Sequence, residues 1–233
     1  MRDAQRPDPR WSGVLFDLDG TLADTVELIL ICFRHTVRAH LGRDLPDAIF
    51  LQGIGTPLPV QLRGFARDEA EHEAMRQTYV NHQLEIHDSM VRPFPGVGSV
   101  LQTLRRGGTP VGIVTSKARG IARRTMEVCG IHESVDVVVC GDEVRQGKPH
   151  PEPVLKAMVG LGLDTAPERV LFVGDSTHDL RAGRAAGTRT AAVGWGPIDR
   201  RVLEAEVPDF FLHRMEEVLD VRPPDADLPA SVR

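Results

Sequence analysis

Short apolar runs recur along the chain, and the polar stretches between them place their apolar residues at helical spacing. Alternation of this kind predicts an α/β fold, a Rossmann-like parallel sheet with helices on both faces. The predicted strands cover residues 13–16, 111–114, 135–139, 170–173, 190–193 and 209–212. The predicted crossover helices cover residues 97–106, 119–129, 153–161 and 179–186.

The stretch between the first two strands is far too long for a single crossover. Residues 26–92 have the pattern of helices, interrupted by the glycine- and proline-rich loop 53–59. A long insert at the carboxyl edge of a sheet usually serves as a lid. An unrelated domain inserted into the core is the alternative. We predict a core domain made of residues 13–25 and 93–221, and a helical cap domain made of residues 26–92. We expect residues 1–12 and 222–233 to be flexible termini.

Composition narrows the class of protein. The chain has 233 residues, a net charge of −5 and a pI near 6.0, without the basic excess of a nucleic-acid-binding protein. Its three cysteines are odd in number and lack CxxC spacing, which argues against disulfides and zinc. No signal-peptide pattern and no apolar run of about 20 residues is present. We expect a cytoplasmic monomer or homodimer that binds neither membrane nor nucleic acid.

Two carboxylates follow the first predicted strand. Asp17 and Asp19 come directly after an apolar run, and Gly20 follows at once. Residues in this position reach the crevice at the carboxyl edge of a sheet, where open α/β proteins bind ligands. Because no lysine or arginine is adjacent in sequence, the two acids repel each other and call for a cation. A strand followed by an ordinary Asp-Gly turn is the alternative interpretation.

Three later segments also carry polar residues at or near strand ends. Thr115, Ser116 and Lys117 follow the second strand, and Lys148 lies in a proline-rich turn before a predicted helix. The fourth strand ends in further acids, Asp175 and Asp179. Only three residues of the chain are lysines, at positions 117, 148 and 156, so two of them fall in these motifs. Lysine in an otherwise arginine-using chain suggests a need for a compact ammonium group.

These four motifs, DxDGT at 17–21, the hydroxyls after a hydrophobic strand, GKPxPE at 147–152 and GDSxxD at 174–179, resemble those of the haloacid dehalogenase superfamily. The resemblance runs from about residue 14 to residue 195. It implies a phosphatase in which Asp17 is the nucleophile of an aspartyl-phosphate intermediate. Asp19 would then be the general acid and base. Dehalogenases of the superfamily lack this second aspartate, so Asp19 argues against dehalogenation.

The resemblance also implies Mg²⁺, which prefers oxygen ligands, as the cofactor. Its implied ligands are the Asp17 carboxylate, the Asp19 backbone carbonyl and Asp175. Asp179 would act through a metal-bound water or by holding Lys148, and a simple charge at a helix N-terminus is the alternative. The expected catalytic set is Asp17, Asp19, Thr115 and Lys148. The residues expected to bind the phosphate are Gly20, Thr115, Ser116 and Lys148. For Lys117, a role in the site and a role on the surface both stay open.

The substrate is less defined than the chemistry. The cap contains no lysine between residues 26 and 92, which argues against a phosphonoacetaldehyde hydrolase. Residues 55–58 and 79–88 resemble stretches of bacterial cytosolic pyrophosphatases and phosphoglycolate phosphatases. We expect a small phosphorylated metabolite or pyrophosphate as substrate. Possible cap contacts, each with a solvated helix face as the alternative, are Arg34, Arg38, Arg63, His82 and His87.

Two other functions stay open at this point. A phosphosugar mutase similar to β-phosphoglucomutase would share the core and a similar cap. A non-catalytic regulatory or partner-binding relative would keep only the fold, although such proteins commonly lose a nucleophile or metal carboxylate and none is missing here.

Overall fold

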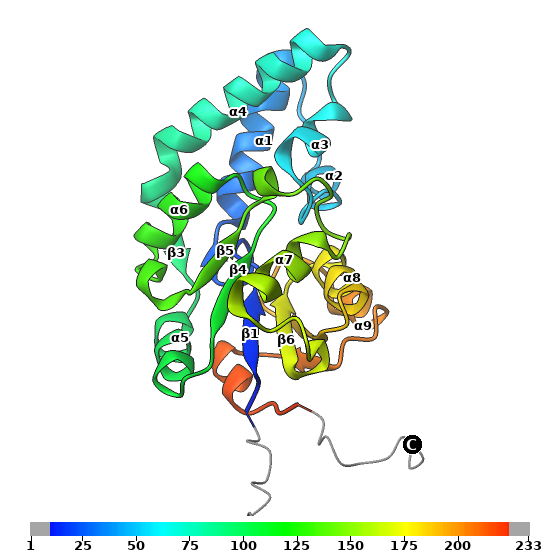
Figure 1. Cartoon of the computed structure of the whole chain (residues 1–233). Coiled ribbons are helices and arrows are strands. Elements are labelled where there is room, and N and C mark those ends of the chain that lie inside the picture. Colours follow the sequence, from blue (N-terminus) through cyan, green and yellow to red (C-terminus); the bar gives the residue numbers. More distant parts are fainter. Residues whose placement is uncertain (1–9, 224–233) are drawn as a thin grey trace, which may run out of the picture.

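A six-stranded parallel sheet forms the centre of the computed structural model, which describes residues 10–223 (Figure 1). The strand order is β5-β4-β1-β6-β7-β8, and every neighbouring pair is parallel. The strands are β1 Gly13–Phe16, β4 Val111–Val114, β5 Val137–Val139, β6 Val170–Gly174, β7 Arg189–Val193 and β8 Phe210–Leu212. This arrangement confirms the predicted α/β fold class.

Both faces of the sheet are buried, which is why its strands are continuous apolar runs. In β1, Leu15 packs on one side with Val154 and Met158 of α7 (Glu152–Leu161). Its neighbours Val14 and Phe16 belong to the core on the other side. Successive strand residues point to opposite faces, so this alternation places a hydrophobic layer on each side of the sheet. The remaining core helices are α5 Val97–Arg106, α6 Arg119–Val128, α8 Thr177–Ala185 and α9 Arg200–Glu204.

Two strands begin later than predicted, and in each case an aspartate side chain just before the strand accepts a hydrogen bond from a backbone amide of the neighbouring strand. The strand predicted to begin at residue 135 begins at Val137, because Asp136 accepts a hydrogen bond from the Val111 amide through Oδ2, at 2.9 Å. Likewise β8 begins after Asp209, whose carboxylate accepts from Arg189 and from the Thr190 amide. The short 3₁₀ helices η1–η4 cover His132–Ser134, Gly141–Glu143, Pro167–Arg169 and Met215–Leu219.

The inserted residues 26–92, which we call the cap segment, are helical as predicted. The helices are α1 Val26–Leu41, α2 Asp47–Leu51, α3 Leu58–Arg63 and α4 Glu69–Met90. They have a small aromatic core in which the Phe33 ring stacks on Phe50 at 5.2 Å and meets Tyr79 edge-on at 5.0 Å. The short antiparallel pair β2 (Ala23–Asp24) and β3 (Arg92–Pro93) brings the entry and exit of the segment together. We propose on this basis that the cap segment is a separate domain.

The N-terminal boundary of the predicted core was placed too late. Trp11 is buried, lies edge-on to Phe210 at 6.0 Å and donates a hydrogen bond from Nε1 to the Val221 carbonyl at 3.1 Å. It therefore belongs to the folded core, although residues 1–12 were predicted to be a flexible terminus. Residues 1–9 and 224–233 of the two predicted flexible termini lie outside the described residues.

None of the described helices combines the length and the apolar character that crossing a membrane requires. The three cysteines are buried and unpaired, at positions 32, 129 and 140.

Candidate active site

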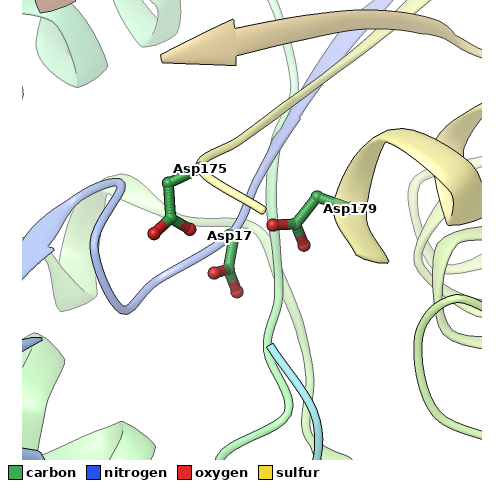
Figure 2. Close-up of side chains that lie close together, drawn as sticks. All are labelled: Asp17, Asp175 and Asp179. Atoms are coloured by element: carbon green, nitrogen blue, oxygen red, sulfur yellow. The ribbon is translucent and has the colours of Figure 1, made fainter. Parts of the chain in front are cut away.

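Three acids converge at the carboxyl edge of the sheet. Asp17 follows β1, Asp175 follows the adjacent strand β6, and Asp179 lies in the first turn of α8. All three are buried, and each offers a ligand oxygen within 4.8 Å of the others. Figure 2 shows the three side chains close together. The topology thus brings together residues that are about 160 positions apart in the sequence.

Lys148 connects two of these acids. Its Nζ donates to Asp17 Oδ1 at 2.7 Å, to Asp179 Oδ1 at 2.6 Å and to the Val114 carbonyl at 3.2 Å. Burial alone would lower the pKa of Lys148, but the charges of Asp17 and Asp179 raise it above its ordinary value. The ammonium is therefore permanently charged, and it holds the Asp17 carboxylate through one oxygen only.

Asp179 uses both of its oxygens within the protein. Oδ1 accepts from Lys148, while Oδ2 accepts from the Ser176 amide at 3.1 Å and from the Ser176 hydroxyl at 2.6 Å. These bonds form a capping box that starts α8 at Thr177, two residues earlier than predicted. Of the roles considered from the sequence, holding Lys148 and capping the helix are both visible in the structure.

Asp175 is enclosed with an unsatisfied oxygen. Its Oδ2 is buried and has no hydrogen-bond partner among residues 10–223. Gly20 lies against it with a φ of 78°, and a Cβ there would come within 2.2 Å of Asp175 Oδ2. Glycine is therefore required at position 20, because a side chain would both strain the backbone and fill the space beside the carboxylate.

The cluster is short of positive charge. Burial raises the pKa of Asp17 to about 7, and the nearby charges of Asp179 and Asp19 add to this while Lys148 opposes it. Burial, followed by the charges of Asp17 and Asp179, raises the pKa of Asp175 well above its usual range. The cluster has three buried carboxylates and one ammonium group, and one carboxylate oxygen has no hydrogen-bond partner among the described residues. This set of groups fits a divalent cation that prefers oxygen ligands.

Asp19 lies beside this cluster and has its own partners. Its Oδ1 accepts from the Thr25 hydroxyl at 2.6 Å and from Lys117 Nζ. The Lys117 side chain is 7% exposed, so the surface role considered for it from the sequence is wrong. Thr25 was missed by the sequence analysis, because only the fold brings its hydroxyl back to the aspartate.

The hydroxyl residues after β4 also reach the site. Thr115 is buried, and its Oγ1 accepts a hydrogen bond from the Lys117 amide at 3.1 Å. Ser116 donates from Oγ to the Gly55 carbonyl of the cap segment at 2.5 Å. The predicted phosphate ligand Ser116 therefore connects the core to the cap loop in this structure.

A cavity of about 250 Å³ opens over these residues, between the core and the cap segment. Its core wall includes Asp17, Asp19, Thr115, Ser116, Lys117 and Lys148. Its cap wall includes Ile29 of α1, the loop 54–57, residues 58, 59 and 61 of α3, and a face of α4. The nucleophile and acid predicted from the sequence thus share one enclosed space.

The cap contacts expected from the sequence do not line this cavity. Arg34, Arg38 and Arg63 form ion pairs with neighbouring acids of the cap segment. His82 stacks on His35 at 4.1 Å. His87 is buried against the Thr125 hydroxyl of α6. None of the five lines the cavity, because local partners or burial occupy them. The α4 residues that do line the cavity are Arg76, Tyr79, Val80 and Gln83.

Comparison with known proteins identifies the class. A family model described as haloacid dehalogenase-like hydrolase matches residues 14–193. The chain belongs to this family and is an enzyme of the hydrolase class, as the motifs predicted. It is 40% identical over 212 residues to the pyrophosphatase PpaX of Bacillus cereus, covering 91% of this chain and 96% of that protein.

Two solved structures extend the comparison of the fold. One is the structure of a predicted phosphoglycolate phosphatase from Haemophilus somnus, with a TM-score of 0.82 and 21% sequence identity. The match covers 90% of this chain and 97% of that one. The other is a β-phosphoglucomutase from Clostridium difficile, with a TM-score of 0.78 and 18% identity over 90% and 96%. At these identities the likeness concerns the fold alone, and it is shared by a hydrolase and a mutase.

Proposed function

We propose that this hydrolase is a Mg²⁺-dependent phosphohydrolase that acts through an aspartyl-phosphate on Asp17. One observation carries the proposal: Asp17 is held through Oδ1 by Lys148, while Oδ2 has no hydrogen bond among the described residues and the side chain lines the cavity. A carboxylate fixed through one oxygen presents the other for attack on phosphorus.

In the first step, Asp17 Oδ2 forms a bond to phosphorus as the bond between phosphorus and the leaving oxygen breaks. Asp19 donates a proton to that oxygen, and its place beside Lys117 and Thr25 fixes the carboxyl group for the transfer. Lys148 and Thr115 line the same cavity, and the ammonium and the hydroxyl would balance the charge on the phosphoryl oxygens.

In the second step, water attacks phosphorus and Asp19 accepts the proton. The bond between phosphorus and Asp17 breaks, which releases phosphate and restores the free carboxylate. Asp19 thus serves first as acid and then as base, and the enzyme returns to its starting state.

Asp17, Asp175 and the Asp19 backbone would hold the metal, with Asp179 supporting it through Lys148. When bound, Mg²⁺ supplies the positive charge that the three buried acids lack and neutralises the transferred phosphoryl group. The orphaned Oδ2 of Asp175 supports this assignment.

For the substrate we propose a small phosphorylated metabolite or pyrophosphate. The similarity to PpaX supports a hydrolase over a mutase, whereas the β-phosphoglucomutase likeness is one of fold only. Conversion of β-glucose 1-phosphate into glucose 6-phosphate without phosphate release would support the mutase instead.

The metal requirement tests this proposal directly. Removing Mg²⁺ with a chelator is expected to abolish phosphate release, and restoring it should recover the activity. Asp175→Asn should lower kcat/KM at least a hundredfold, because it removes several kcal/mol of charge stabilisation. Asp44→Asn, an exposed cap position paired with Arg38, is the matched control and should behave like the wild type. Full activity in chelator would contradict the metal assignment.

A further inference from the structure

One face of α4 covers the active-site cavity. Arg76, Tyr79, Val80 and Gln83 all line it, and their spacing of three, four and seven residues places them on the same side of the helix. The opposite wall carries Asp17 and Asp19. A substrate whose phosphoryl group meets Asp17 therefore has its leaving group directed toward this face.

Two polar side chains on this face line the cavity and have no hydrogen-bond partner in the described part of the protein. Tyr79 is 3% exposed and Gln83 is 5% exposed. Among residues 10–223, the Tyr79 hydroxyl and the Gln83 amide make no hydrogen bond to another residue. Both polar groups open to the cavity one helical turn apart, so a bound ligand that carries oxygens can complete their hydrogen bonds.

The cations that line the cavity are already paired with acids. Lys148 is paired with Asp17 and Asp179, and Lys117 with Asp19. Arg76 is held by Glu73 of the same helix through two contacts, at 2.6 and 2.7 Å. No cation in the cavity wall of the described chain lacks an acidic partner.

Much of the rest of the cap wall is apolar. The apolar residues lining it include Ile29, Ile54, Leu58 and Val80. A second phosphate group in this space would lose water against hydrocarbon and would meet no cation that is not already shared with an acid. An uncharged organic group meets neither penalty, because its carbon skeleton matches the apolar side chains and its oxygens match the two free polar groups.

We infer that Tyr79 and Gln83 bind the leaving group, and that the preferred substrate is a phosphate monoester of an uncharged alcohol with additional hydroxyl or carbonyl oxygens. A phosphorylated polyol or sugar has this chemistry. The inference rests on the proposed function and narrows it, since it places pyrophosphate and 2-phosphoglycolate among the poorer substrates.

A substrate panel with Mg²⁺ tests the preference. The panel consists of pyrophosphate, 2-phosphoglycolate, methyl phosphate, glycerol 1-phosphate, erythrose 4-phosphate, ribose 5-phosphate and glucose 6-phosphate. At least one of the four hydroxylated monoesters is expected to exceed pyrophosphate and 2-phosphoglycolate in kcat/KM tenfold or more. A higher kcat/KM for pyrophosphate or 2-phosphoglycolate than for every hydroxylated monoester would overturn the inference, while the proposed hydrolysis would still hold. Release from no substrate would instead contradict the proposed function.

Variants of the two residues test the assignment itself. Gln83→Leu and Tyr79→Phe should each lower kcat/KM for the best hydroxylated substrate about tenfold, mainly through KM. Methyl phosphate offers no oxygen beyond its phosphate, so its kcat/KM should stay within threefold of the wild type. Gln77→Leu removes an exposed glutamine of the same helix and is the matched control. An equal loss on both substrates, or no loss on either, would show that these side chains do not bind the leaving group.

Discussion

At the scale of single residues, the site depends on how each carboxylate is held. Asp17, Asp19 and Asp179 each bind a lysine, and Asp175 binds none. In the proposed mechanism, acids with the same chemistry thus receive different roles from their neighbours, as nucleophile, proton carrier, support and metal ligand. Lys117 is the least expected of these neighbours, because it links the hydroxyl motif after β4 to the acid that follows β1.

Lys117 yields a prediction about the proton transfer. Lys117→Met removes the group that orients Asp19, so kcat for a poor leaving group such as an alkyl phosphate should fall roughly ten- to a hundredfold. For para-nitrophenyl phosphate, whose leaving group needs little protonation, the loss should be much smaller. Steady-state rates on both substrates measure the difference, with Lys156→Met as a control outside the site. Equal losses would indicate that Lys117 acts on binding or folding and not on the acid.

The residue scale is also where sequence reasoning was strongest. The four motifs led to Asp17, Lys148 and Asp175 because each follows an apolar run or a proline-rich turn, and parallel strands end at one edge. For the cap, sequence reasoning did not find the residues that line the cavity, because Arg34 and His87 are chemically as suitable for binding a substrate as Gln83. Only the packing shows that Arg34 binds acids of the cap segment, that His87 is buried against α6, and that Gln83 faces the cavity.

At the scale of elements, the apolar runs predicted every strand of the sheet, and the errors lay at the ends. Those ends depend on single side chains, such as Asp136 replacing a ladder bond and Ser176 capping α8. Glycines and prolines mark such positions in a sequence, whereas hydrogen bonds to residues far along the chain leave no local signal. For this reason the strand order and the two-stranded base of the cap segment became visible only in three dimensions.

The contact between α4 and α6 carries a pH-dependent prediction. His87 of α4 is fully buried, with Nε2 at 2.9 Å from the Thr125 hydroxyl of α6 and Nδ1 at 2.8 Å from Asp88. Burial lowers the pKa of His87, although Asp88, itself paired with Arg124, opposes this. As pH falls through about 6.5, the unfolded chain takes up a proton that the folded chain resists. The contribution of His87 to stability is therefore complete above this pH and declines below it.

Urea unfolding at pH 7.5 and pH 5.5 tests this linkage. The wild type should lose more unfolding free energy between the two values than His87→Gln, which cannot titrate. His87→Gln should also cost about 1–3 kcal/mol at pH 7.5, since it disturbs buried hydrogen bonds. His82→Gln, at a half-buried histidine of the same helix, should keep the wild-type pH slope. A wild-type slope in His87→Gln would contradict the assignment.

At the scale of the whole molecule, chemistry and recognition come from different parts of the chain. The core supplies the residues that we propose as nucleophile, proton carrier and metal ligands, all at one edge of the sheet. The cap segment covers that edge (Figure 1) and supplies the cavity wall that we propose to bind the leaving group. Ser116 donates to Gly55 across the boundary, so the closed arrangement is fixed beside the reacting groups. This division lets the cap determine the substrate while the core keeps its chemistry.

The central claim is that Asp17 carries the phosphoryl group, and trapping that group tests it most directly. The enzyme is mixed with Mg²⁺ and its best substrate, radiolabelled in the phosphoryl group, and quenched in acid within one turnover. We expect label on the protein, removable by hydroxylamine and located by mass spectrometry on the peptide that contains Asp17. Asp17→Asn should carry no label and show no turnover. Turnover without label in the wild type, label on another residue, or intact turnover in Asp17→Asn would contradict the account.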